Sequence, residues 1–113
     1  MRRTPVRKLL AVGAVLAGVT LVPATAALSS ATTVRVGDNW FKPKLLTVEQ
    51  HSTVTWRFVG NKVHNVTVIQ GPVRFSSPSR SSGTYRRHLT KRGTYRIVCS
   101  IHKGRQKMTL TVE

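Results

Sequence analysis

The stretch TVTWRF, residues 53–58, alternates polar and apolar side chains one by one. In an extended strand, successive side chains point to opposite faces. Val54, Trp56 and Phe58 therefore share one face, and the intervening threonines and arginine share the other. We expect this segment to be a strand, with Trp56 and Phe58 in the core.

The same alternation recurs on both sides of this stretch. Comparable runs lie at residues 33–36, 45–48, 64–69, 84–89, 94–99 and 107–112. Turn signals rich in Gly, Pro, Asn or Asp separate these runs, and no helical periodicity stands out beyond the N-terminal apolar segment. About seven short strands predict an all-β fold, an antiparallel sandwich or barrel. The polar segment 76–83 is expected to be a loop that crosses the outside of the sheets.

The N-terminal segment has the three parts of a signal peptide. A basic start precedes the apolar residues 9–22, and Ala-Thr-Ala at 24–26 supplies a cleavage pattern. The apolar run is shorter than the roughly 20 residues that a membrane span needs. We predict that residues 1–26 are a cleaved signal peptide and that residues 27–113 form one exported domain, secreted or held in the cell envelope or periplasm, with no membrane span.

The predicted domain is strongly basic. Four of the 19 Lys and Arg residues lie in residues 1–26, so the remaining 15 face three acidic residues, a net charge of +12. Such a surface favours acidic partners. With so few carboxylates, acid/base catalysis and the binding of hard cations have almost no residues to use.

Cys99 is the only cysteine of the chain. Thiols of exported proteins normally pair, so an unpaired one has three explanations: a buried apolar residue, an intermolecular disulfide or a metal ligand. His102 follows three residues later, and His64 opens a distant predicted strand. One thiolate and two imidazoles form the donor set that holds copper in a trigonal site with a weak axial fourth ligand. This donor set favours the metal-ligand interpretation.

Four segments together carry a family resemblance. They are Phe41-x-Pro43-x-x-Leu46-Thr47-Val48, Ser52-Thr53-Val54-Thr55-Trp56, His64-Asn65-Val66 and Tyr95-x-x-x-Cys99-Ser100-x-His102. In these segments the chain resembles the cupredoxins, the small blue-copper proteins of the plastocyanin and azurin group. The resemblance implies a Greek-key antiparallel β-sandwich, one type 1 copper ion and one-electron transfer between Cu(I) and Cu(II).

The resemblance also implies roles for individual residues. By position, His64 and His102 are the imidazole ligands and Cys99 is the thiolate ligand. Asn65 matches the asparagine that ties the first histidine's loop to the loop after the cysteine, here with Ser100 as its partner. Such outer hydrogen bonds orient metal ligands.

The axial position departs from the family pattern. The family usually places a methionine three to five residues after the second histidine, but Arg105, Gln106 and Lys107 occupy these positions, and Met108 comes one residue later. Met108 is the first choice, in a loop slightly longer than usual. Gln106 is the alternative, with Met108 then in the core beside Leu110. The third possibility is a site without an axial side chain. Arg105 is excluded because its guanidinium stays protonated.

The sequence thus predicts an exported electron carrier and not an enzyme, because the predicted copper has no open position and no acid/base pair is apparent. Lys103 and Arg105 flank His102 and predict transient docking of a monomer onto an acidic redox partner. Two alternatives remain: a non-redox copper carrier or scavenger, and a metal-free cationic module for anionic surfaces. Nucleic acid is disfavoured, because no exposed aromatic residues alternate with the basic ones.

Overall fold

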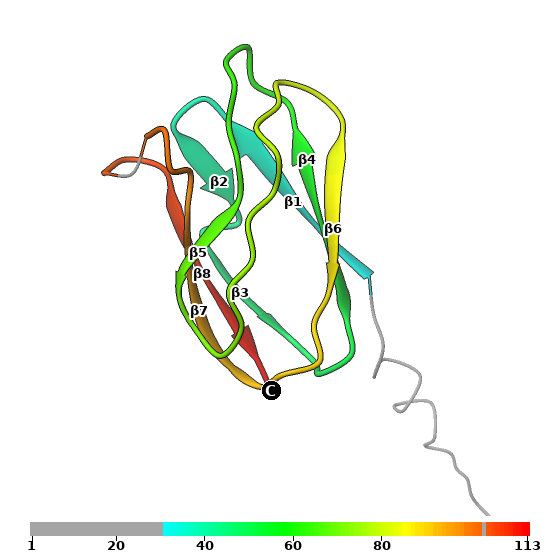
Figure 1. Ribbon diagram of the computed structural model, residues 1–113. Coiled ribbons are helices and arrows are strands. Elements are labelled where there is room, and N and C mark those ends of the chain that lie inside the picture. Colours follow the sequence, from blue (N-terminus) through cyan, green and yellow to red (C-terminus); the bar gives the residue numbers. More distant parts are fainter. Residues whose placement is uncertain (1–30, 103) are drawn as a thin grey trace, which may run out of the picture.

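Two four-stranded sheets pack face to face (Figure 1). The computed structural model describes residues 31–102 and 104–113, so the predicted signal peptide and Lys103 lie outside the described residues. The strands are β1 (Ala31–Gly37), β2 (Trp40–Lys42), β3 (Leu45–Val48), β4 (Thr53–Phe58), β5 (Thr67–Gln70), β6 (Thr84–His88), β7 (Gly93–Val98) and β8 (Lys107–Val112). One sheet has the order β2-β1-β4-β6 and the other β3-β8-β7-β5. The prediction of a β-sandwich is confirmed.

The strands differ from the sequence prediction chiefly at β2 and at β5. The described residues contain eight strands, and the additional one, β2, is three residues long. Such a segment is too short to show a periodicity, although its middle residue Phe41 is buried. The run predicted at 64–69 becomes strand only from Thr67, and His64 forms an isolated antiparallel bridge with Arg80.

The strand directions are mixed, whereas the sequence predicted an antiparallel sandwich. β1 pairs with β4 in parallel, and β3 pairs with β8 in parallel. The chain passes from β2 in one sheet to β3 in the other and back to β4 in the first. Strands joined by a hairpin must be antiparallel, but strands connected through the opposite sheet are free of that constraint. Alternation shows which face a side chain occupies and carries no information on strand direction.

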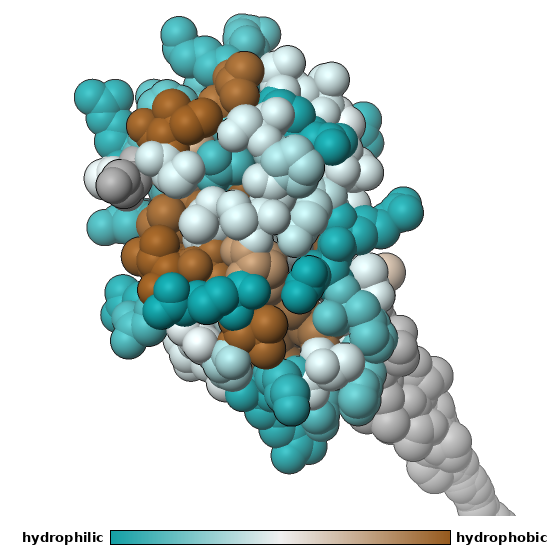
Figure 2. All heavy atoms as spheres, viewed as in Figure 1, coloured by the Kyte–Doolittle hydropathy of each residue, from teal (hydrophilic) through white to brown (hydrophobic). Residues whose placement is uncertain are grey.

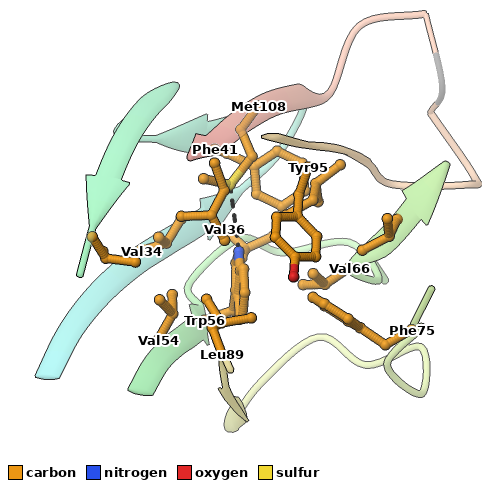
Figure 3. Packing of buried hydrophobic residues seen from close by; sticks show 14 of the residues in the cluster. Val34, Val36, Phe41, Val54, Trp56, Val66, Phe75, Leu89, Tyr95 and Met108 are labelled. Atoms are coloured by element: carbon orange, nitrogen blue, oxygen red, sulfur yellow. Dashed lines mark hydrogen bonds between the residues drawn. The ribbon is translucent and has the colours of Figure 1, made fainter. Parts of the chain in front are cut away.

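The core lies between the two sheets and centres on Trp56, which is fully buried (Figure 3). Phe58 is 4% exposed, so the expected core positions of both aromatic residues are confirmed. The indole Nε1 of Trp56 donates a hydrogen bond to the sulfur of Met108, with 3.4 Å between the two atoms. Because β4 and β8 belong to different sheets, this contact joins the two layers.

The connections β1–β2, β4–β5 and β7–β8 lie at one end of the sandwich, and the C-terminus lies at the other (Figure 1). The three predicted metal ligands come from two of these connections. The turns at this end therefore decide how the ligands are arranged. No helix in the described part of the chain has the length and hydrophobicity that crossing a membrane requires.

Candidate metal centre

Cys99 and His102 lie in the connection that follows β7. Cys99 is fully buried, and its backbone N–H donates to the carbonyl of Gln106 at 3.0 Å. The N–H of His102 donates to the carbonyl of Cys99 at 3.1 Å, and the N–H of Gln106 donates to the carbonyl of His102 at 3.0 Å. These bonds fold the connection back on itself. The thiol is thereby held inside, while His102 is only partly buried.

His64 reaches the same site from the connection between β4 and β5. Its backbone exchanges two hydrogen bonds with Arg80, at 3.0 and 2.9 Å. Two residues later, the N–H of Val66 donates to the hydroxyl of Ser77 at 2.9 Å, and the N–H of Ser77 donates to the carbonyl of Val66. The polar loop 76–83 therefore does more than cross the outside of the sheets, because its first half fixes the His64 segment.

The three side chains form one cluster in which each offers a ligand atom, all within 4.8 Å of one another. The sulfur of Cys99 is 3.6 Å from Nδ1 of His102 and 4.0 Å from Nδ1 of His64. A sulfur at about 2.3 Å and a nitrogen at about 2.0 Å from the same trigonal ion would be about 3.7 Å from each other. The donor set and its spacing therefore fit a single copper ion.

Asn65 links the two ligand-bearing segments. Its side-chain Nδ2 donates to the hydroxyl of Ser100 at 2.8 Å, and its Oδ1 accepts the backbone N–H of Ser100 at 2.9 Å. Thr67 donates a further hydrogen bond to Oδ1 of Asn65. The residues next to His64 and next to Cys99 are thus held together through one amide.

Asp38 also contacts this site, although its place in the sequence predicted no role there. Its Oδ1 lies 2.9 Å from Nε2 of His64. The carboxylate also accepts the backbone N–H groups of Asn61 and Lys62. The hydrogen bond from His64, followed by those from Lys62 and Asn61, lowers the pKa of Asp38 to about 2. In the sequence, Gly37-Asp38 is a turn signal only, and no local pattern relates Asp38 to a histidine 26 residues away.

The two candidates for the axial position have different surroundings. The sulfur of Met108 lies in the core and accepts the hydrogen bond of Trp56 (Figure 3). Gln106 is fully buried, and its Nε2 donates to the backbone carbonyls of Gly37 and Trp40, at 2.6 and 2.9 Å. Its Oε1 is buried and has no hydrogen-bond partner within the described residues. A buried carbonyl oxygen without a donor is rare in a folded protein, and a bound ion is one of its explanations.

No protein-family model and no curated protein sequence matches the chain. Several solved structures match it. A purple cupredoxin from Nitrosopumilus maritimus is 21% identical, with a TM-score of 0.65 over 73% of this chain and 99% of its own. An oxidised amicyanin variant is 25% identical, with a TM-score of 0.62 over 74% and 82%. A copper-containing nitrite reductase from Thermus scotoductus SA-01 is 31% identical over 74% of this chain, with a TM-score of 0.65, but the chain spans only 22% of that protein.

The shared sandwich and the His-Cys-His cluster identify this chain as a cupredoxin. The resemblance that the sequence motifs indicated is confirmed. Copper is the cofactor of this class, and the cluster of His64, Cys99 and His102 fits a blue-copper site for one ion.

Proposed function

We propose that this protein is an exported electron carrier that uses one copper ion held by His64, Cys99 and His102. The observation that carries the proposal is the cluster itself, in which one thiol and two imidazoles meet at one end of the sandwich. Copper, when bound, supplies a one-electron couple between Cu(I) and Cu(II). The export rests on the signal-peptide pattern of residues 1–26.

The protein's own part is to hold the donors still and to give the electron a path. Cys99 and His64 are both fully buried, and backbone hydrogen bonds fix each of them. Donors that barely move between oxidation states make electron transfer fast, because little structure has to rearrange. His102 is the only one of the three that reaches the surface, so it is the ligand through which we expect the electron to pass.

The visible spectrum after addition of Cu(II) tests this function. We expect an intense blue colour, which comes from the thiolate ligand, and a fast reversible midpoint in voltammetry. A colourless protein that selects Cu(I) and releases it to a chelator would instead establish the copper carrier. If the protein takes up no copper, the result would favour the alternative function, a metal-free cationic module that binds anionic surfaces.

We further propose that Gln106 is the axial donor, with Met108 as a core residue. The unpartnered Oε1 of Gln106 and the hydrogen bond from Trp56 to the sulfur of Met108 support this choice of alternative. An amide oxygen is a harder donor than a thioether. It therefore favours Cu(II) over Cu(I) and gives a lower reduction potential.

The pair Gln106→Leu and Met108→Leu separates the two axial candidates. Removal of the amide oxygen should raise the reduction potential and change the visible spectrum of the copper form. Met108→Leu should leave both unchanged, although it should lower the free energy of unfolding by about 1–3 kcal/mol, because the buried N–H of Trp56 loses its acceptor. The reverse pattern, a spectrum sensitive to Met108 and indifferent to Gln106, would assign the sulfur as axial ligand.

The surface around His102 combines apolar and basic side chains. Of the six large apolar residues that the described chain exposes, three lie in connections at the metal end: Val59, Val63 and Ile101. A fourth, Trp40, is the first residue of β2, directly after the β1–β2 connection. Figure 2 shows apolar patches at this end, with hydrophilic side chains around them. Arg105 is exposed in the β7–β8 connection. We propose that this face docks transiently, as a monomer, on an acidic redox partner, with apolar contact around His102 and basic residues, Arg105 and Lys103, that steer the approach.

Ionic strength tests the steering. The rate of oxidation of the reduced copper protein by the anion hexacyanoferrate(III) should fall as salt increases, because salt screens the attraction. Arg105→Gln should slow the reaction at low salt. Arg92→Gln, an exposed arginine of the β6–β7 connection, should have a smaller effect, because that connection lies away from the metal end (Figure 1). A rate that does not change with salt would contradict electrostatic docking.

A further inference from the structure

A buried histidine of the metal cluster is paired with a carboxylate from another part of the chain. His64 is fully buried, and its Nε2 lies 2.9 Å from Oδ1 of Asp38, whose side chain is 32% exposed. An ionised carboxylate can only accept a hydrogen bond, so Nε2 must carry the proton. In neutral imidazole the other nitrogen, Nδ1, then has a free lone pair, and Nδ1 is the atom that faces the sulfur of Cys99. The pairing with Asp38 thus selects the tautomer that can bind a metal.

The carboxylate is itself held in place. Its oxygens accept the N–H of Asn61 at 3.1 and 3.2 Å, and Oδ1 accepts the N–H of Lys62 at 3.0 Å. Gly60 packs directly against it, since a Cβ at position 60 would clash with Oδ1. A larger residue at position 60 would force the carboxylate to move. The position of Asp38 is therefore built into the β4–β5 connection as well as into its own turn.

The same turn orients a second side chain of the site. Gly37 and Trp40 are the first and last residues of the turn that contains Asp38, and the backbone carbonyls of both accept hydrogen bonds from Nε2 of Gln106. Because both carbonyls can only accept hydrogen bonds, the amide nitrogen of Gln106 must face them, and its Oε1 points away from them. Asn39 closes the turn with a φ of 69°, in the left-handed region that asparagine tolerates better than most residues.

We propose that Asp38 is a positioning residue for the copper ligand His64, and that the β1–β2 turn, residues 37–40, is the scaffold that orients both His64 and Gln106. This inference rests on the proposed copper function. A carboxylate behind a metal-bound histidine fixes the ring and makes it a stronger donor, and loss of such a partner typically weakens metal binding about 10–100-fold. It also places a negative charge close to the site, which favours Cu(II).

Asp38→Asn tests the proposal, with Glu49→Gln as its matched control. Both changes remove one negative charge, but Glu49 is exposed in the turn after β3, at the opposite end of the sandwich (Figure 1). The first measurement is nitrogen NMR of the His64 ring in the metal-free protein. We expect the proton on Nε2 in the wild type and in Glu49→Gln, and a changed tautomer population in Asp38→Asn.

The second measurement is made on copper-loaded protein. Asp38→Asn should weaken copper binding about 10–100-fold and raise the reduction potential, whereas Glu49→Gln should change neither clearly. Gly60→Ala is a second variant that displaces the carboxylate while it keeps every charge, and it should shift the tautomer and the affinity in the same direction. Equal tautomer populations, affinities and potentials in Asp38→Asn and Glu49→Gln would overturn the proposal.

A failure of the copper function would give a different result. The wild type would then bind no copper, while the tautomer of His64 in the metal-free protein would still depend on Asp38. The NMR measurement thus tests the positioning of His64 independently of the metal.

Discussion

Replacement of Cys99 by serine is expected to abolish the blue colour of the copper-loaded protein. The absorption of such a site comes from charge transfer between a thiolate and Cu(II), and a serine hydroxyl is neither ionised at neutral pH nor a soft donor. Cys99 is fully buried, and its sulfur lies within 4.0 Å of both histidine nitrogens. No other thiol in the chain can replace it.

The fold of this variant should persist, because serine is close to cysteine in size and its hydroxyl can hydrogen-bond to Nδ1 of a neighbouring histidine. Urea unfolding of the metal-free protein checks this point. His88→Gln is the control for copper at surface histidines, since His88 is exposed and is not part of the cluster. It should keep the full colour. Equal colour in Cys99→Ser and in the wild type would exclude the thiolate as a ligand.

Trp56→Ala should cause a severe loss of stability. Trp56 is fully buried, and its ring lies against those of Phe75 and Tyr85, with centroids 6.1 and 6.0 Å away. Truncation of a buried aromatic residue costs about 3–5 kcal/mol, out of a total stability of about 5–15 kcal/mol for a typical domain. The change also removes the hydrogen bond to Met108 that joins the two sheets.

Trp40→Ala is the matched control for this prediction. Trp40 is 38% exposed, so its truncation removes less buried area and should cost clearly less. Urea unfolding of both metal-free variants gives the comparison in free energy. Similar losses in the two variants would show that Trp56 is not the centre of the core.

The local pattern of the sequence was sufficient for an all-β fold, for the core face of β4 and for the pair Cys99 and His102. Alternation places Val54, Trp56 and Phe58 on one face whatever the neighbouring strand is, because the side-chain period belongs to the strand itself. Cys99 and His102 lie three residues apart, so their proximity is also a local property. The distant partner His64 was found through its family motif and the chemistry of the donor set, not through periodicity.

The tertiary structure alone decided which strands pair in parallel, which polar groups support the ligands, and what surrounds Gln106 and Met108. Alternation is the same in parallel and antiparallel pairs, so the β1–β4 and β3–β8 pairings left no trace in it. Asp38 meets a histidine 26 residues away, and the amide of Gln106 meets a carbonyl 69 residues away. Hydrogen bonds of this kind depend on loop positions in space, and those positions exist only after the two sheets have packed.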